Sequence, residues 1–257
     1  MIFETHAHYD DERFDGTREE ILSSLPSNGV GTVINVGSDV PSSEFSIELA
    51  EKYSYVYAAV GVHPHAAENM TEADLERIRM LSRHEQAVAI GEIGLDYYYD
   101  LDFKDKQQYW FTRQLELAAE ENLPIIVHSR DAAKDTFDLI SNSRVRRGVI
   151  HAYSGSLEMA KDYINMGFYI GVGGVVTFKN AKKLVEVVKN IPIESILLET
   201  DSPYLSPEPV RGTCNNSQNI KYIVQKISEI KQISPDFIVE TTRKNAERLF
   251  DKKKVVA

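Results

Sequence analysis

Eight short apolar runs recur along the chain at a nearly constant interval, and amphipathic stretches separate them. The runs are Ile2–Thr5, Thr32–Val36, Val56–Val60, Val88–Ile90, Ile125–Val127, Val149–Ile150, Tyr169–Val172 and Ile196–Leu198. They begin about 28 residues apart, which is the length of one strand followed by one helix. Strands that alternate with helices in this way pair in parallel through right-handed crossovers. The pattern therefore predicts an α/β fold.

The stretches between the runs carry apolar residues at helical spacing. One begins at Thr71, an expected N-cap with Asp74 as its capping-box partner. Another extends from Lys104 to Glu121, and two more, Ile220–Ile230 and Pro235–Phe250, follow the eighth run. Eight units without a linker or a break in composition favour a closed (β/α)8 TIM barrel over an open doubly wound sheet. We expect a barrel with extra C-terminal helices.

The chain has 257 residues, a length typical of one barrel, so we expect residues 1–257 to form a single domain. Its 39 acidic and 29 basic residues give a net charge of −10, which argues against coating nucleic acid by charge alone. That balance does not exclude a protein that handles nucleic acid through metal ions.

The single cysteine, Cys214, permits no intrachain disulfide and suits a reducing compartment. The first residues show no signal-peptide pattern, and no apolar run approaches the ~20 residues of a membrane span. We therefore expect a cytoplasmic protein with no membrane contact, and the sequence indicates no obligate protein partner.

Six of the seven histidines lie at or just beyond the C-terminal ends of predicted strands. They are His6, His8, His63, His65, His128 and His151, whereas His84 lies at a polar helix end. A single histidine in such a place is usually a satisfied rim or core residue, and His65 is best interpreted as a turn residue after Pro64. Six at the end of the barrel where barrel enzymes build their sites indicate a functional site.

The spacing of His6 and His8 turns both rings to one face of the first strand, so both can bind one metal ion. Asp201, at the end of the eighth strand, would join them across the closure of the barrel. Glu4 shares strand parity with His6, and Glu199 shares it with Asp201. Each is either an acceptor for a metal-bound histidine or a buried polar contact inside the barrel.

His128 and His151 come from the adjacent fifth and sixth strands and would bind a second ion, with Glu92 of the fourth strand bridging both. We expect two divalent ions, magnesium, manganese or zinc, with coordination positions left open for water and substrate. Two such ions favour hydrolysis, because they lower the pKa of a bound water and neutralise the attacked group. Glu92 and Asp201 are the expected catalytic residues, and Asp201 would accept the proton of the water.

The motifs at these strand ends resemble those of the TatD family of metal-dependent deoxyribonucleases. Six pieces follow in family order and cover essentially the whole chain: His6-Ala7-His8, Gly61–Pro64, Gly91–Tyr97, Pro124–Arg130, His151–Gly155 and Glu199–Tyr204. The resemblance implies an amidohydrolase-like barrel, a phosphodiester substrate, and His6, His8, Glu92, His128, His151 and Asp201 as metal ligands. It also implies that His63 lies near the substrate phosphate and that Arg211 belongs to the family's loop after strand eight.

Several further residues are expected on the same face of the barrel as substrate contacts. Arg130 and Arg211 would pair with phosphate oxygens, or else form surface salt bridges. Asp96 is a further expected substrate contact. Tyr97, with the neighbouring residues Tyr98 and Tyr99, would stack on bases or pack under the following helix.

These features lead to one leading hypothesis, a two-metal DNase with 3′–5′ exonuclease character on single-stranded or frayed DNA, as the resemblance implies. The first alternative is a related hydrolase of a small cyclic amide, lactone or phosphoester. Many such enzymes use a modified lysine on strand four, where this chain has Glu92. The second alternative is a non-catalytic scaffold that metals stabilise, and the open coordination positions argue against it.

Overall fold

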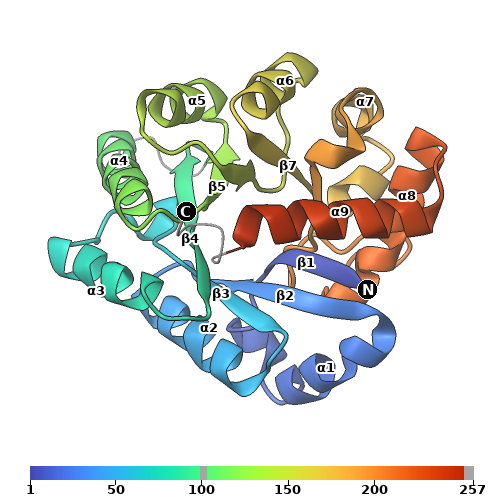
Figure 1. The fold of residues 1–257 in the computed structure, drawn as a ribbon, viewed down its shortest axis with the longest axis horizontal. Coiled ribbons are helices and arrows are strands. Elements are labelled where there is room, and N and C mark those ends of the chain that lie inside the picture. Colours follow the sequence, from blue (N-terminus) through green and yellow to red (C-terminus); the bar gives the residue numbers. More distant parts are fainter. Residues whose placement is uncertain (99–102, 252–257) are drawn as a thin grey trace.

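The computed structural model of this chain describes residues 1–98 and 103–251. Eight parallel strands form one sheet in sequence order (Figure 1). They are β1 (Ile2–Ala7), β2 (Val30–Val36), β3 (Val56–Val60), β4 (Ala87–Asp96), β5 (Ile125–Arg130), β6 (Gly148–Ile150), β7 (Phe168–Val172) and β8 (Ile196–Leu198). Each predicted apolar run lies within one strand, so the predicted (β/α)8 barrel is confirmed.

The first and last strands meet at the C-terminal end of the barrel. The Thr5 hydroxyl donates to the Leu198 carbonyl at 3.0 Å. Just beyond, the Asp201 amide donates to the His6 carbonyl at 2.9 Å, and the His8 amide donates to the Ser202 carbonyl at 2.7 Å. The sheet is therefore nearly closed, and its closure brings Asp201 beside His6 and His8.

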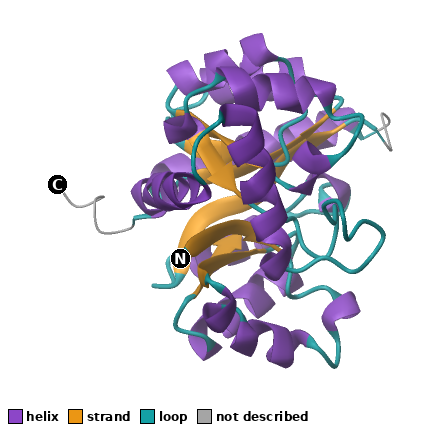
Figure 2. Ribbon diagram, turned by 90° about the vertical axis from the view of Figure 1, so that its right-hand side faces the viewer, coloured by secondary structure: helices purple, strands orange, loops and turns teal. Residues whose placement is uncertain are grey.

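Helices surround the strands on the outside of the barrel (Figure 2). Those of the described residues are α1 (Arg18–Ser24), α2 (Val40–Lys52), α3 (Glu72–Ser82), α4 (Lys104–Glu120), α5 (Ala133–Asn142), α6 (Leu157–Asn165), α7 (Lys182–Asn190), α8 (Ile220–Lys231) and α9 (Pro235–Phe250). The larger apolar core joins strand residues such as Val33 and Ile170 to helix residues such as Phe111 and Val187. Within the described residues, no helix is both long and apolar enough to cross a membrane.

The last helix, α9, closes the N-terminal end of the barrel and crosses it in Figure 1. A second apolar cluster fills the interior and includes Phe3 of β1 together with Leu249 and Phe250 of α9. The rings of Phe3 and Phe250 stack with their centroids 6.2 Å apart. The helix α9 therefore covers this end of the barrel.

The fourth strand is longer than the predicted run Val88–Ile90, since β4 continues to Asp96 with all ten residues buried. Its pairing with β5 shifts register between Ile90 and Ile93. Glu92 consequently lies in the middle of the strand, and Asp96 lies at its end.

The predicted capping box of α3 is present, and it supports a stability prediction. The Thr71 hydroxyl accepts from the Asp74 amide at 3.3 Å, and the Asp74 carboxylate accepts from the Thr71 amide at 2.8 Å. Thr71→Ala is expected to lower the free energy of unfolding by about 1 kcal/mol, because the first turn of the helix loses its cap. Urea denaturation measures this, with Thr71→Ser as the control that keeps the cap. An unchanged denaturation midpoint in the alanine variant would contradict the prediction.

Candidate metal centre

A cavity of about 640 Å³ opens at the C-terminal ends of the strands. Its lining includes five of the six expected metal ligands: His8, Glu92, His128, His151 and Asp201. The sixth, His6, is fully buried directly behind His8, with the two Nε2 atoms 3.0 Å apart. The structure therefore brings together all six residues that the strand-end argument selected.

The Glu92 carboxylate lies between two pairs of histidines. Its Oε2 atom is 3.4 Å from His6 Nε2 and 3.7 Å from His8 Nε2. Its Oε1 atom is 2.9 Å from His128 Nδ1 and 3.9 Å from His151 Nε2. One oxygen thus faces each pair, which is the arrangement that a carboxylate shared by two ions requires.

Asp201 faces the same centre from the loop after β8. Its Oδ1 atom is 3.8 Å from His6 Nε2, 3.5 Å from His8 Nε2 and 3.6 Å from His151 Nε2. The residue adopts a left-handed backbone conformation with φ of 57°, which aspartate tolerates better than most residues. The hydrogen bond from its amide to the His6 carbonyl holds it in this place.

These residues fit a divalent cation. His8 Nδ1 is 2.7 Å from the Val36 carbonyl oxygen, an acceptor, so Nδ1 carries a proton and Nε2 is the atom left to bind an ion. His8 Nε2 lies 3.0 Å from His6 Nε2, close enough for one ion to contact both nitrogens in place of a shared proton. The ligand atoms of His6, His8 and Glu92 all lie within 4.8 Å of one another. Ligands bound at ~2.0–2.2 Å to one ion lie at such separations.

The electrostatics of the centre also favour positive charge. Burial lowers the pKa of His8, His128 and His151, yet nearby carboxylates outweigh it and raise the values to about 9, 9 and 10. Burial likewise opposes ionisation of Glu92 and Asp201, but the surrounding histidines hold the pKa of both below the ordinary value. The carboxylates thus hold protons on the histidines when no metal is bound, and a divalent cation would replace that charge.

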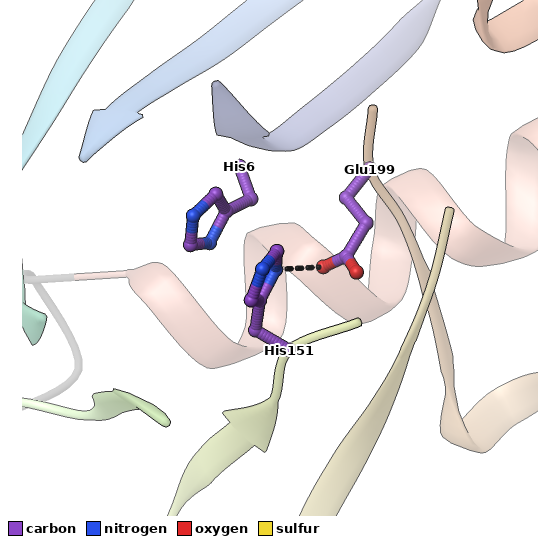
Figure 3. A group of neighbouring side chains, drawn as sticks. All are labelled: His6, His151 and Glu199. Carbon is purple, nitrogen blue, oxygen red and sulfur yellow. Dashed lines mark ion pairs between the residues drawn. The ribbon is translucent and has the colours of Figure 1, made fainter. Parts of the chain in front are cut away.

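Glu199 and Glu4 differ in what they contact. Glu199 Oε2 lies 3.2 Å from His151 Nδ1, and its Oε1 accepts from the Ala152 amide (Figure 3). The His151 ring in turn stacks on His6 with centroids 3.5 Å apart. Glu4 Oε1 instead accepts from the backbone amides of His6 and Thr200. Of the two, Glu199 pairs with the His151 ring, whereas Glu4 joins the backbone of β1 to that of the residues after β8.

Asp96 lines the cavity, but its carboxylate is occupied by protein groups. Its Oδ2 lies 3.1 Å from His128 Nε2 and 2.8 Å from His65 Nε2, and its Oδ1 accepts from the Tyr98 amide at 2.9 Å. This geometry orients the His128 ring with Nδ1 toward Glu92. His65, for which we favoured a turn role, lies in the turn Pro64–Ala66 and also lines the cavity.

Asp96→Asn is expected to weaken binding of the ion near His128 by about 10–100-fold, because an amide no longer holds the ring as a carboxylate does. Calorimetric titration with manganese, on protein from which a chelator has removed the metal, measures the change. Asp105→Asn, an exposed substitution on α4, is the matched control. Wild-type affinity in the Asp96 variant would contradict a positioning role for this carboxylate.

Of the expected substrate contacts, Arg130 and His63 line the cavity. Arg130 lines the cavity, and its guanidinium lies 3.7 Å from the centroid of the Tyr98 ring. His63 Nδ1 accepts from the His65 amide at 3.1 Å, so its Nε2 carries the proton and points toward Glu92 Oε1 at 3.9 Å. Burial lowers the pKa of His63 to about 3, so the ring stays neutral and acts as a hydrogen-bond donor.

Tyr97 and Arg211 lie elsewhere. The Tyr97 hydroxyl donates to Asp135 at 2.9 Å, so the ring packs between α4 and α5, as the alternative interpretation expected. The Arg211 guanidinium lies over the Phe178 ring at 4.1 Å, and neither Tyr97 nor Arg211 is among the lining residues within the part of the chain that is described. Tyr99 falls outside the described residues.

Histidines and carboxylates that converge at the C-terminal end of an eight-stranded barrel are an arrangement suited to metal-dependent hydrolysis. The sequence model of the family described as "TatD related DNase" matches residues 3–251. The chain is 44% identical to an uncharacterized metal-dependent hydrolase of Bacillus subtilis (strain 168), YabD, over 97% of this chain and 99% of the relative. This chain therefore belongs to the TatD family.

Solved structures agree with this assignment. The crystal structure of YjjV, a TatD homologue from Escherichia coli K12, matches with a TM-score of 0.93 and 32% identity over 97% of this chain and 98% of that one. A TatD family hydrolase from Entamoeba histolytica matches with a TM-score of 0.87 at 24% identity, over 97% and 98% of the two chains, and supports the fold.

Proposed function

We propose that this metal-dependent hydrolase is a two-ion deoxyribonuclease that removes nucleotides from the 3′ end of single-stranded or frayed DNA. The observation that carries the proposal is the placement of Glu92, whose two oxygens each face a different pair of histidines. Such a carboxylate suits a pair of ions, and paired ions are typical of enzymes that cleave phosphodiesters.

In this proposal the chain holds the ions with the residues described above. His6, His8 and Asp201 would hold one ion, His128 and His151 would hold the other, and Glu92 would serve both. When bound, the ions supply an acidified water and neutralise charge on the phosphate and its leaving oxygen. Glu199 and Asp96 keep the His151 and His128 rings oriented.

The remaining residues accept the proton of the water and bind the phosphate of the substrate. The Asp201 carboxylate reaches the cavity, where its side chain is 16% exposed, and is the group placed to accept the proton of the attacking water. His63 donates a hydrogen bond from Nε2 to a phosphate oxygen. Arg130 provides a positive charge at the rim, and it is the one lysine or arginine lining the cavity in the described part of the chain.

The size of the cavity and the net charge of the chain support an activity directed at DNA ends. A volume of about 640 Å³ is in the range of pockets for small ligands and accommodates a terminal nucleotide better than a duplex. The net charge of −10 gives no broad electrostatic attraction for DNA. The same volume would admit a small cyclic amide, lactone or phosphoester, which stays the competing substrate class.

A nuclease assay after metal removal tests the proposal. The chelated protein is assayed on 5′-labelled single-stranded DNA, blunt duplex and duplex with a 3′ overhang, before and after magnesium, manganese or zinc is added. We expect activity only with metal, products that shorten from the 3′ end, and faster cleavage of single strands than of blunt duplex. Turnover of a lactone or small phosphoester but not DNA would favour the competing substrate. Metal-dependent stability without any turnover would favour a scaffold.

A further inference from the structure

Tyr204 is an exposed aromatic residue at the rim of the metal cavity. It follows Asp201 by three residues, and its amide donates to the Asp201 carbonyl at 2.8 Å. Its side chain is 44% exposed, and the adjacent Leu205 is 37% exposed. Both residues line the cavity. Neighbouring apolar side chains that stay exposed at a binding cavity form the kind of patch that can contact a ligand.

The Tyr204 ring is held in place before any ligand arrives. Its hydroxyl donates to Asp11 Oδ2 at 3.0 Å, and the Arg13 guanidinium lies 4.0 Å from the ring centroid. Arg13 is itself fixed by two hydrogen bonds to the Asp11 carboxylate, at 2.9 and 2.8 Å. Arg13 is not among the lining residues, so it covers the ring away from the cavity. A ring fixed in this way loses little conformational freedom when something stacks on its open face.

The ring is also close to the proposed reaction centre. Its centroid lies 6.1 Å from that of His8, with the ring planes at 80°. His8 Nε2 is in turn 3.5 Å from Asp201 Oδ1. A phosphodiester that reaches the ion between these residues therefore carries its nearest base, one sugar away, to the level of Tyr204.

We propose that Tyr204 and Leu205 form a stacking subsite for the 3′-terminal nucleobase, on the 3′ side of the cleaved phosphodiester, an inference that rests on the proposed nuclease function. Stacking on an aromatic ring is tolerant of sequence, because every base has a π face. The subsite therefore selects substrates that carry a base at this position and does not distinguish one base from another. It also explains how a chain with a net charge of −10 holds a DNA end.

The test compares two single-stranded oligodeoxynucleotides that differ only in their 3′-terminal nucleotide, one normal and one abasic. Wild-type protein is expected to prefer the normal substrate in kcat/KM by roughly tenfold. Tyr204→Ala reduces this preference to less than about twofold, whereas Tyr204→Phe keeps most of it because the ring remains. Tyr109→Ala, which removes an exposed tyrosine of α4 far from the cavity, keeps both the preference and the rate.

The outcomes separate the subsite from the nuclease. Manganese affinity and thermal denaturation of each variant establish that its fold and metal centre are intact. A wild-type protein that cleaves DNA without preferring the normal end, or a Tyr204→Ala variant that keeps the full preference, overturns the stacking subsite alone. A wild-type protein that cleaves neither oligonucleotide, with metal bound, overturns the nuclease function and the subsite together.

Discussion

Glu92→Gln is expected to lower kcat/KM for DNA by at least ~10²-fold and to weaken binding of both metal ions. The amide has nearly the same shape as the carboxylate, but it is neutral and replaces one of its two oxygens with NH₂. Because one carboxylate oxygen faces His6 and His8 and the other faces His128 and His151, the substitution disturbs both sides of the centre. A residue that contacted only one ion would weaken only one binding event.

Two measurements made together check this expectation: steady-state cleavage of single-stranded DNA and calorimetric titration with manganese. Glu121→Gln, on the outside of the barrel where Glu121 pairs with Arg83, is the matched control and keeps the wild-type values. Equal cleavage by the Glu92 variant and the wild type would point to a contaminating nuclease and would remove the basis of the assignment. Loss of only one of the two binding events would show that Glu92 does not bridge two ions.

Asp201→Asn is expected to reduce kcat by about 10²–10⁴-fold, the usual contribution of a positioned general base. The variant keeps an oxygen toward His8 and His151 but has no carboxylate to accept the proton of the attacking water. We therefore expect a larger loss in kcat than in metal affinity, and this difference separates proton transfer from ligation.

Single-turnover cleavage at saturating manganese measures the effect on the chemical step. Asp138→Asn, at an exposed pair with Lys134 on α5, serves as the control for loss of an aspartate charge. If the rate returned to the wild-type value once enough metal was present, Asp201 would be a ligand and not a base.

The barrel and the convergence of the candidate ligands at one end of it were predictable because they depend on local pattern. The repeat of apolar runs determines which segments become strands, and the strand period places His6 and His8 together. Parallel strands also end on one side of a barrel, so His128, His151 and Asp201 had to lie on the same face. The structure confirms the strand assignments, places His128 and His151 beside Glu92, and places Asp201 beside His151.

Other features depend on contacts between distant segments, which no local pattern encodes. The extension of β4 to Asp96 accompanies its register with β5. The hydrogen bond between His65 and Asp96 joins residues 31 positions apart, so the cavity role of His65 was missed. Tyr97 and Tyr204 are both tyrosines beside strand-end motifs, yet one packs against Asp135 and the other stays exposed at the rim. That difference follows from the path of the surrounding loops.

Glu92 is expected to lie between two metal ions. The most direct measurement is anomalous diffraction from crystals of the protein grown with manganese. We predict two anomalous peaks on either side of the Glu92 carboxylate, one beside His6 and His8 and the other beside His128 and His151. A single peak, or peaks that do not contact Glu92, would contradict the account.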